Sequence, residues 1–156
     1  MKKRIGIVAE KLSHSLSPII HNYWMKINKI EAEYVCFEIK PNETDQFYKD
    51  FKKDDNLLGF NVTVPYKENF FRISDNLQGR AKNIGSVNLV YKKNKNVYGD
   101  NTDYIGFAKT YKKLVTKNVN KILLIGAGGA ARSILQFLND EKIKQVDIFT
   151  RTLNKK

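Results

Sequence analysis

Two side chains that lie far apart in the sequence have the types needed for acid–base chemistry. Lys67 comes two residues after Pro65, where a buried strand is expected to end and a helix to open near a cleft. Asp103 stands at the start of a helical pattern. If the two side chains meet, they form a couple for proton transfer. Alternatively, Asp103 is only a favourable charge at a helix N-terminus, worth about 0.3–1 kcal/mol.

Amide and hydroxyl groups accompany Lys67. Alternation along the strand that precedes it places Asn61 and Thr63 on one side. Asn88 adds a further amide inside an apolar run, where it costs free energy unless it is hydrogen-bonded. Together with the ammonium of Lys67, these groups suit an anionic small molecule that carries several hydroxyls.

A further pair of polar side chains lies between the first expected strand and the first expected helix. Ser15 and Ser17 are two residues apart in this loop, beside a helix start that Pro18 marks. Their hydroxyls can donate to a carboxylate, which the helix dipole also favours; the alternative is that Ser17 serves only as the N-cap. His14 and His21 have no nearby thiol or acidic partner, so no metal site is expected.

The second part of the chain holds a glycine-rich turn between an apolar strand and a helical segment. Gly126, Gly128 and Ala131 fit the pattern G-x-G-x-x-A. In that pattern the first glycine permits a tight turn, the second lets the backbone approach a pyrophosphate, and the small third residue packs the helix against the strand. We therefore expect a dinucleotide to bind at the turn, whose residues are Gly126, Ala127, Gly128, Gly129 and Ala130. The alternative is a glycine-rich helix start that serves packing alone.

The end of the next strand discriminates between dinucleotides. An NAD site favours a carboxylate there, which accepts hydrogen bonds from the ribose hydroxyls. This strand instead runs into Thr150, Arg151 and Thr152, and the guanidinium of Arg151 can pair with a 2′-phosphate. The sequence therefore favours NADP; Asp147, within the strand, is the competing ribose ligand.

Alternating strand and helix patterns place these groups. Strands are expected at 4–9, 33–39, 57–62, 121–125 and 145–149, with a hairpin over 86–91 and 96–99, and helices from Ser17, over 42–51, from Lys67, over 103–116 and over 133–138. The fold class is therefore α/β: an N-terminal three-layer α/β unit followed by an incomplete Rossmann-type βαβ unit. A full dinucleotide fold has about six parallel strands, and this sequence reaches only the second.

Composition excludes several classes of protein. Of 156 residues, 42% are hydrophobic, which excludes a disordered polycation in spite of a net charge of +12. No apolar run approaches the roughly 20 residues of a membrane helix, so no membrane partner is expected. Of the 28 basic residues, 23 are Lys, spread without an Arg-rich or aromatic stripe, so nucleic acid is not expected as a partner. Residues 104–156 carry 11 basic and 3 acidic side chains, which favours an anion there.

The cysteine content bears on the compartment. Cys36 is the single cysteine, so it cannot form an internal disulfide, and its apolar neighbours Val35 and Phe37 predict a position in the core. The first residues lack the long apolar run of a secretory leader. A cytoplasmic location is therefore expected.

An ordered series of motifs resembles the shikimate dehydrogenase family. The series is HSLSPIIHN at 14–22, GFNVTVPYK at 59–67, GSVN at 85–88, GDNTDYIG at 99–106, GAGGAAR at 126–132 and TRT at 150–152. The resemblance implies a shikimate-binding catalytic domain over 1–103, a connecting helix over 104–118 and a partial NADP-binding Rossmann domain over 119–156. It also implies reversible NADPH-dependent reduction of 3-dehydroshikimate to shikimate, in the chorismate pathway to the aromatic amino acids.

The resemblance gives a role to each polar group. Ser15 and Ser17 would hold the shikimate carboxylate, Asn61, Thr63, Asn88 and Asp103 would hydrogen-bond the ring hydroxyls, and Lys67 and Asp103 would form the catalytic pair. Two segments depart from the family. Ala9 and Lys11 stand where Gly and Pro are frequent, and Thr150 replaces the Asn of an Asn-Arg-Thr phosphate motif.

The resemblance covers only the first part of the family's NADP domain. The later segments, which in this family return a Tyr and a Gln to the substrate, are absent from the sequence. We expect a truncated shikimate dehydrogenase, monomer or homodimer, that binds shikimate weakly and reduces NADP slowly or not at all. The alternatives are a quinate/shikimate dehydrogenase that accepts NAD, and a non-catalytic remnant that binds shikimate-like acids.

Overall fold

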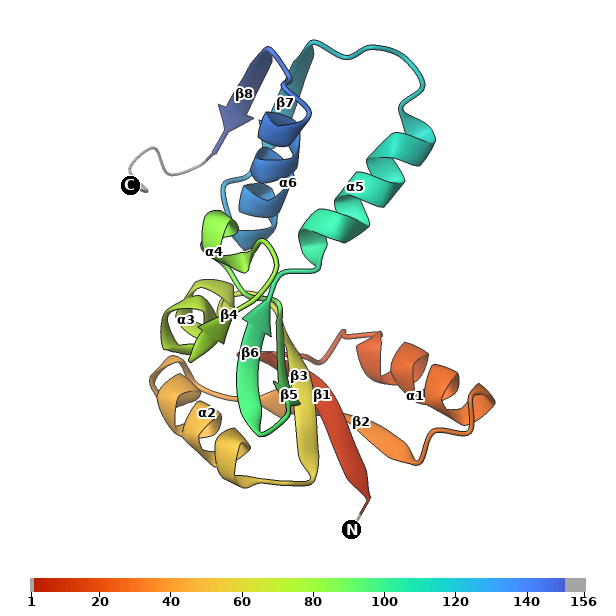
Figure 1. Ribbon diagram of the computed structural model, residues 1–156, viewed down its shortest axis with the longest axis vertical. Coiled ribbons are helices and arrows are strands. Elements are labelled where there is room, and N and C mark those ends of the chain that lie inside the picture. The colour runs from red at the N-terminus through yellow and green to blue at the C-terminus, as the bar shows by residue number, and fades with distance from the viewer. Residues whose placement is uncertain (1, 151–156) are drawn as a thin grey trace.

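The computed structural model describes residues 2–150, which form a six-stranded and a two-stranded sheet (Figure 1). The strands are β1 (Lys3–Ala9), β2 (Ala32–Glu38), β3 (Leu57–Val62), β4 (Asn76–Leu77), β5 (Leu89–Lys93), β6 (Asn96–Asp100), β7 (Lys121–Ile125) and β8 (Gln145–Phe149). The helices are α1 (Ser17–Ile27), α2 (Thr44–Lys53), α3 (Lys67–Ile73), α4 (Ala81–Ile84), α5 (Asp103–Leu114) and α6 (Gly129–Asp140), with a 3-10 turn at Pro41–Glu43. None of the helices within 2–150 is both long enough and apolar enough to cross a membrane. The predicted α/β class is confirmed.

The order of strands in the larger sheet brings the expected site residues to one edge. The order is β2-β1-β3-β5-β6-β4. β1 pairs in parallel with both β2 and β3, and α1 and α2 lie in the two crossovers. Parallel neighbours end at the same edge of a sheet, where α/β proteins usually bind ligands. The loop after β1, with Ser15, therefore lies beside the segment after β3 that leads to Lys67.

The hairpin of β5 and β6 returns the chain to that edge. Asn94 and Lys95 form its turn, and both have the positive φ that a tight hairpin requires. Asp100 ends β6 and α5 follows. The first hairpin strand was predicted to begin at Ser86, which is too early: the Val87 N–H donates to the Lys67 carbonyl instead. Regular pairing with β3 and β6 starts at Leu89.

An aromatic core fixes α2 and α3 on one face of the larger sheet. The ring centroid of Phe60, on β3, lies 4.9 Å from that of Phe51 on α2 and 5.2 Å from that of Phe70 on α3. Both pairs are edge-to-face, the arrangement that aromatic quadrupoles favour. Phe70 is completely buried. Its packing therefore fixes the helix whose first residue is Lys67.

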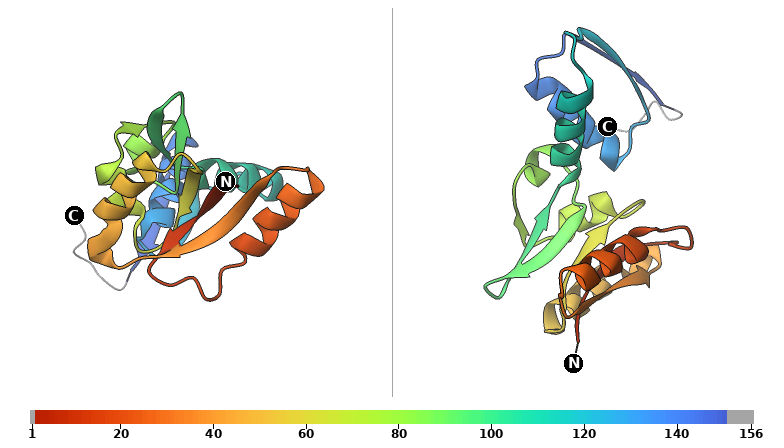
Figure 2. Two further views of the ribbon diagram at one scale, coloured as in Figure 1. Left: turned by 90° about the horizontal axis from the view of Figure 1, so that it is seen from below. Right: turned by 90° about the vertical axis from the view of Figure 1, so that its right-hand side faces the viewer.

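Helix α1 covers the opposite face, over β1 and β2 (Figure 2). Met25 on α1 packs against Ile7 and Tyr34. Cys36 is exposed, so its predicted core position is wrong. Cys36 lies on β2, an edge strand that has a neighbouring strand on one side only.

Helix α5 leads from the larger sheet to the second unit (Figure 1). There β7 and β8 pair in parallel, with α6 as their crossover. The ring of Phe137 on α6 is buried against three aromatic rings of α5, those of Tyr104, Phe107 and Tyr111. This cluster packs α6 onto α5. It therefore determines where the glycine-rich turn lies relative to Asp103.

Removal of the Phe70 ring should destabilise the fold strongly. Phe70→Ala leaves a cavity among Phe47, Tyr48 and Phe60, and such cavities cost about 3–5 kcal/mol. Ile19→Ala truncates a side chain that is 69% exposed and should change the free energy of unfolding by less than about 0.5 kcal/mol. Urea unfolding followed by circular dichroism compares the two variants. Equal effects would contradict the position of the core.

Candidate functional site

Lys67 and Asp103 form an ion pair at the carboxyl edge of the larger sheet. Lys67 Nζ lies 2.6 Å from Asp103 Oδ2, and the two side chains are 12% and 29% exposed. Each is the first residue of its helix, α3 and α5. The dipole of α5 stabilises the carboxylate of Asp103, whereas that of α3 opposes an ammonium at its N-terminus. The carboxylate of Asp103 therefore offsets the unfavourable dipole of α3 at the Lys67 ammonium.

Asn88 holds the second oxygen of the same carboxylate. Its Nδ2 donates to Asp103 Oδ1 over 2.7 Å and to Thr102 Oγ1 over 3.0 Å. Its Oδ1 accepts from the Thr102 N–H over 2.8 Å. The buried amide is therefore fully hydrogen-bonded, which offsets the cost expected for Asn88 in an apolar segment. Lys67 and Asn88 together fix both oxygens of Asp103.

Asn101 holds the start of α5 from the residue before its N-cap, Thr102. Its Oδ1 accepts from the Asp103 N–H over 3.1 Å, and its Nδ2 donates to the carbonyl and the hydroxyl of Ser86 over 3.0 and 2.9 Å. Ser133 on α6 donates to the same Oδ1 over 3.1 Å. Asn101, Ser86 and Ser133 are all buried. A buried polar network thus links Asp103 to both units, a role that the sequence alone did not show.

Tyr34 connects the predicted groups near α1. Its hydroxyl donates to Asn61 Oδ1 over 2.8 Å. Burial raises the pKa of Tyr34 to about 12, and a hydrogen bond with Ser17 opposes this shift. Together Tyr34 and His21 line, with Asn61, a hollow of about 390 Å³ over β1, β3 and β5. The sequence reasoning missed Tyr34; the signal was a buried tyrosine on a strand, whose hydroxyl must find a partner.

Ser17 does not have the geometry of an N-cap, which was the alternative to a role in binding a carboxylate. Ser17 is the first residue of α1, Leu16 occupies the N-cap position, and no side chain caps the helix. The reading of Ser17 as N-cap is therefore wrong. The Ser15 Oγ instead accepts from the Ser17 N–H over 3.3 Å. This leaves both hydroxyl groups half-buried at the sheet edge, near the helix N-terminus.

Thr63 lies in the turn between β3 and α3. Its N–H donates to the Val8 carbonyl over 3.2 Å and its carbonyl accepts from the Tyr66 N–H over 3.0 Å. The side chain is half-buried. These hydrogen bonds attach the end of β3 to β1, a few residues before Lys67.

The glycine-rich turn lies between β7 and α6, as predicted. Gly126 has φ +108°, which favours glycine, and Gly128 is the N-cap of α6. A Cβ built on either residue meets nothing within 4 Å, so the backbone is open to a bound group. Ala131 is buried, as the motif requires for close packing of the helix. Such an exposed backbone before a 12-residue helix fits a pyrophosphate, whose charge the helix dipole favours.

The structure says less about the other residues that were expected at the cofactor. Ala127 and Ala130 lie in and directly after the turn. Arg151 and Thr152 lie outside the described residues. Asp147 is on β8, where its Oδ2 lies 3.5 Å from Lys121 Nζ. Within residues 2–150, no group of three or more His, Cys, Asp and Glu side chains could hold a metal ion.

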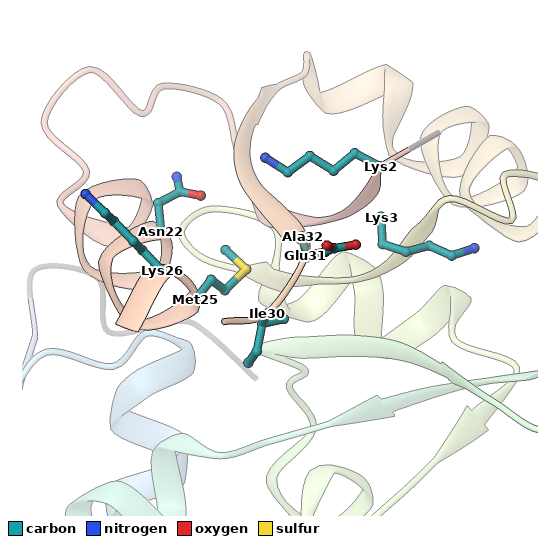
Figure 3. Close-up of a pocket in the computed structure, with 8 residues that line it drawn as sticks. All are labelled: Lys2, Lys3, Asn22, Met25, Lys26, Ile30, Glu31 and Ala32. Atoms are coloured by element: carbon teal, nitrogen blue, oxygen red, sulfur yellow. The ribbon is translucent and has the colours of Figure 1, made fainter. Parts of the chain in front are cut away.

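A larger hollow, of about 790 Å³, lies at the opposite, amino end of β1 and β2. Lys2, Lys3, Lys26 and Glu31 contribute its charged groups (Figure 3). The three ammonium groups point in different directions rather than toward a common centre. Its geometry therefore offers no anion site, in contrast to the edge that holds Lys67 and Asp103.

Fold and site together define a class: a two-part α/β protein with a polar cluster at the carboxyl edge of one sheet and a glycine-rich turn in an adjoining βαβ unit. The family described as "Shikimate dehydrogenase substrate binding domain" matches residues 7–90. The chain belongs to the shikimate dehydrogenase family.

Individual relatives agree with this assignment. The chain is 41% identical over 154 residues to a shikimate dehydrogenase (NADP(+)) of Clostridium perfringens, covering 98% of this chain and 56% of that one. A crystal structure of shikimate dehydrogenase 1 from Peptoclostridium difficile superposes with a TM-score of 0.90 at 35% identity, over 99% of this chain and 57% of that one. The Thermus thermophilus enzyme in complex with NADP(H) and shikimate gives a TM-score of 0.84 at 27% identity, over 96% and 56%. The chain thus spans little more than half the length of these relatives.

Stability should fall at acidic pH through His21. The His21 ring stacks on Tyr34 with centroids 4.3 Å apart, and burial lowers the pKa of His21 below its ordinary value of 6.5. The folded chain therefore binds fewer protons than the unfolded chain between the two pKa values, and stability is lost as pH falls through that window. Urea midpoints at neutral and mildly acidic pH should differ less for His21→Gln than for the wild type. An unchanged difference would contradict this contribution.

Proposed function

We propose that this chain carries the substrate site and the first part of the cofactor site of a shikimate dehydrogenase, which reduces 3-dehydroshikimate to shikimate with NADPH. The observation that carries the proposal is the Lys67–Asp103 pair, 2.6 Å between Nζ and Oδ2. The pair lies at the sheet edge where the parallel strands end. The glycine-rich turn at the start of α6 lies close to it. Family membership and the names of the relatives support the same reaction.

In the proposed complex, Ser15 and Ser17 donate to the shikimate carboxylate, and the N-terminus of α1 adds a favourable dipole. The ring hydroxyls meet Asn61, Thr63, Asn88 and Asp103. The hydrogen bond from Tyr34 to Asn61 Oδ1 supports this, because it orients the Asn61 amide nitrogen, which donates one N–H to the Asn88 carbonyl over 3.5 Å and has a second N–H for a substrate oxygen. The network at Asn88 similarly fixes the carboxylate that would accept from a hydroxyl.

Lys67 and Asp103 are the proposed catalytic pair. NADPH, when bound, supplies a hydride to the 3-keto carbon. As negative charge grows on the keto oxygen, Lys67 stabilises it and gives it a proton, so that the product hydroxyl forms and a neutral amine remains. Asp103 holds the ammonium in place before the transfer, because its own carboxylate is fixed by Asn88. In the reverse direction Lys67 accepts the proton.

The cofactor proposal concerns NADP. The open backbone at Gly126 and Gly128 fits a pyrophosphate, and Ala127, Gly129 and Ala130 complete the turn. Arg151 and Thr152 are proposed to meet the 2′-phosphate, on the basis of residue type and position in the sequence. The domain division proposed is 1–103 for substrate, 104–118 as connector and 119–156 for cofactor. A cytoplasmic location is part of the proposal and suits the free thiol of Cys36.

The carboxylate subsite is tested by a pair of ligands. Ser15→Ala should weaken shikimate binding by about tenfold, since a hydrogen bond to a charged group is lost, and should leave binding of shikimate methyl ester nearly unchanged. Ser13→Ala, an exposed serine of the same loop, is the matched control. Isothermal titration calorimetry gives both affinities. Equal losses for acid and ester would place the carboxylate elsewhere.

The catalytic pair is tested by binding and turnover together. Asp103→Asn keeps the size of the side chain but removes the charge that holds Lys67, so shikimate affinity should fall by about tenfold or more. NADPH formation from shikimate, followed by absorbance with the wild-type chain, measures turnover. Binding without turnover would support the substrate site and agree with the expectation that this chain reduces NADP slowly or not at all. No binding at all would contradict the proposed function.

A further inference from the structure

Gly129 differs from the other glycines of its turn. A Cβ built on Gly129 lies 3.2 Å from both Cβ and Cδ of Lys67, whereas one built on Gly126 or Gly128 meets nothing within 4 Å. Contacts this short force one of the two atoms to move. The lack of a side chain at Gly126 and Gly128 leaves room for a ligand, while at Gly129 it leaves room for the lysine.

The clash could not be relieved by a movement of the lysine tip alone. Lys67 Cβ is attached directly to the backbone at the first residue of α3, and the Lys67 carbonyl accepts from the Val87 N–H over 2.9 Å. The neighbouring Ser86 hydroxyl donates to the Gly129 carbonyl over 3.4 Å. Both Lys67 and Gly129 are therefore held to the same short segment, Ser86 and Val87.

Two further contacts hold α6 in place, one to α3 and one to the start of α5. Arg132 Nη2 on α6 lies 3.2 Å from Glu68 Oε1 on α3. Ser133 on α6 donates to Asn101 Oδ1, which also accepts from the Asp103 N–H. A methyl group at Gly129 would thus require the stem of Lys67 or the start of α6 to shift by a few tenths of an ångström.

We propose that Gly129 is a positioning residue for Lys67: the bare backbone at the start of α6 supports the lysine stem and holds its ammonium against Asp103. This inference depends on the proposed function only for its effect on shikimate. It predicts that a residue of the cofactor turn controls the geometry of the proton donor. The matched control is Gly128→Ala, which adds the same methyl group to the same turn in open space.

The first test needs no ligand. In the chain labelled with ¹³C-lysine, the Cε–Hε signal of Lys67 is identified by its loss in Lys67→Met. Gly129→Ala should shift this signal, and Gly128→Ala should leave it as in the wild type. An unshifted signal in folded Gly129→Ala would overturn the proposal. If Gly129→Ala does not fold, nuclear Overhauser contacts between Gly129 Hα and the Lys67 side chain in the wild type decide, and their absence would overturn it.

The second test is a double-mutant cycle on shikimate affinity. Gly129→Ala should weaken shikimate binding about fivefold in the wild type, roughly the effect of one misplaced hydrogen bond. In the Lys67→Met background the same substitution should change affinity less than about twofold, since the two residues act through one group. Equal losses in both backgrounds would contradict the proposal. If the wild type does not bind shikimate, the proposed function fails. The ligand-free test then still decides whether Gly129 positions Lys67.

Discussion

The charge of Lys67 at the beginning of α3 is the constraint on which the site depends. A helix N-terminus disfavours an ammonium, and the Lys67 side chain is only 12% exposed to solvent. Asp103 compensates from the N-terminus of a second helix, where the dipole favours a carboxylate. Opposite charges therefore join the first residues of α3 and α5. Any substrate bound there would exchange hydrogen bonds with a pair that is already in place.

The polar network behind this pair explains how two small units act as one. Asn101 contacts Ser86, Ser133 and the first residue of α5 with a single amide. Asn101, Ser86 and Ser133 are all buried. Losing one partner would therefore leave an unsatisfied polar group, which costs about 1–3 kcal/mol. The ion pair of Arg80 and Asp140 adds a further connection between α6 and the larger unit. The glycine-rich turn is thereby held at the edge that carries the ion pair.

Much of the fold was predictable because apolar runs are strong local signals. The strands over 57–62, 121–125 and 145–149 were predicted with the observed bounds. Lys67 was predicted to open a helix because Pro65 ends the strand before it. The short elements β4 and α4 were not predicted, since two and four residues carry no periodicity. The helix start at Ser17 was correctly placed, but its capping role was wrong because local residue preference cannot show which residue takes the N-cap geometry.

The candidate site was predictable in its residue types and less so in its contacts. Asn88 could be seen to need partners, and the structure supplies Thr102 and Asp103. Tyr34, Asn101 and the contact of Gly129 with Lys67 depend on segments that meet only in the fold. Cys36 was placed in the core because its neighbours in sequence are apolar, whereas it is exposed on β2, an edge strand of the larger sheet.

A shikimate titration of the ¹⁵N-labelled chain, followed by amide chemical shifts, tests most directly whether the edge around Lys67 and Asp103 is the substrate site. The largest shifts should fall on the loop from Ser15 to Ser17, on residues 61–67, and on Asn88 and Asp103. Shifts confined to the hollow around Lys2, Lys3 and Lys26, or none at saturating shikimate, would contradict it.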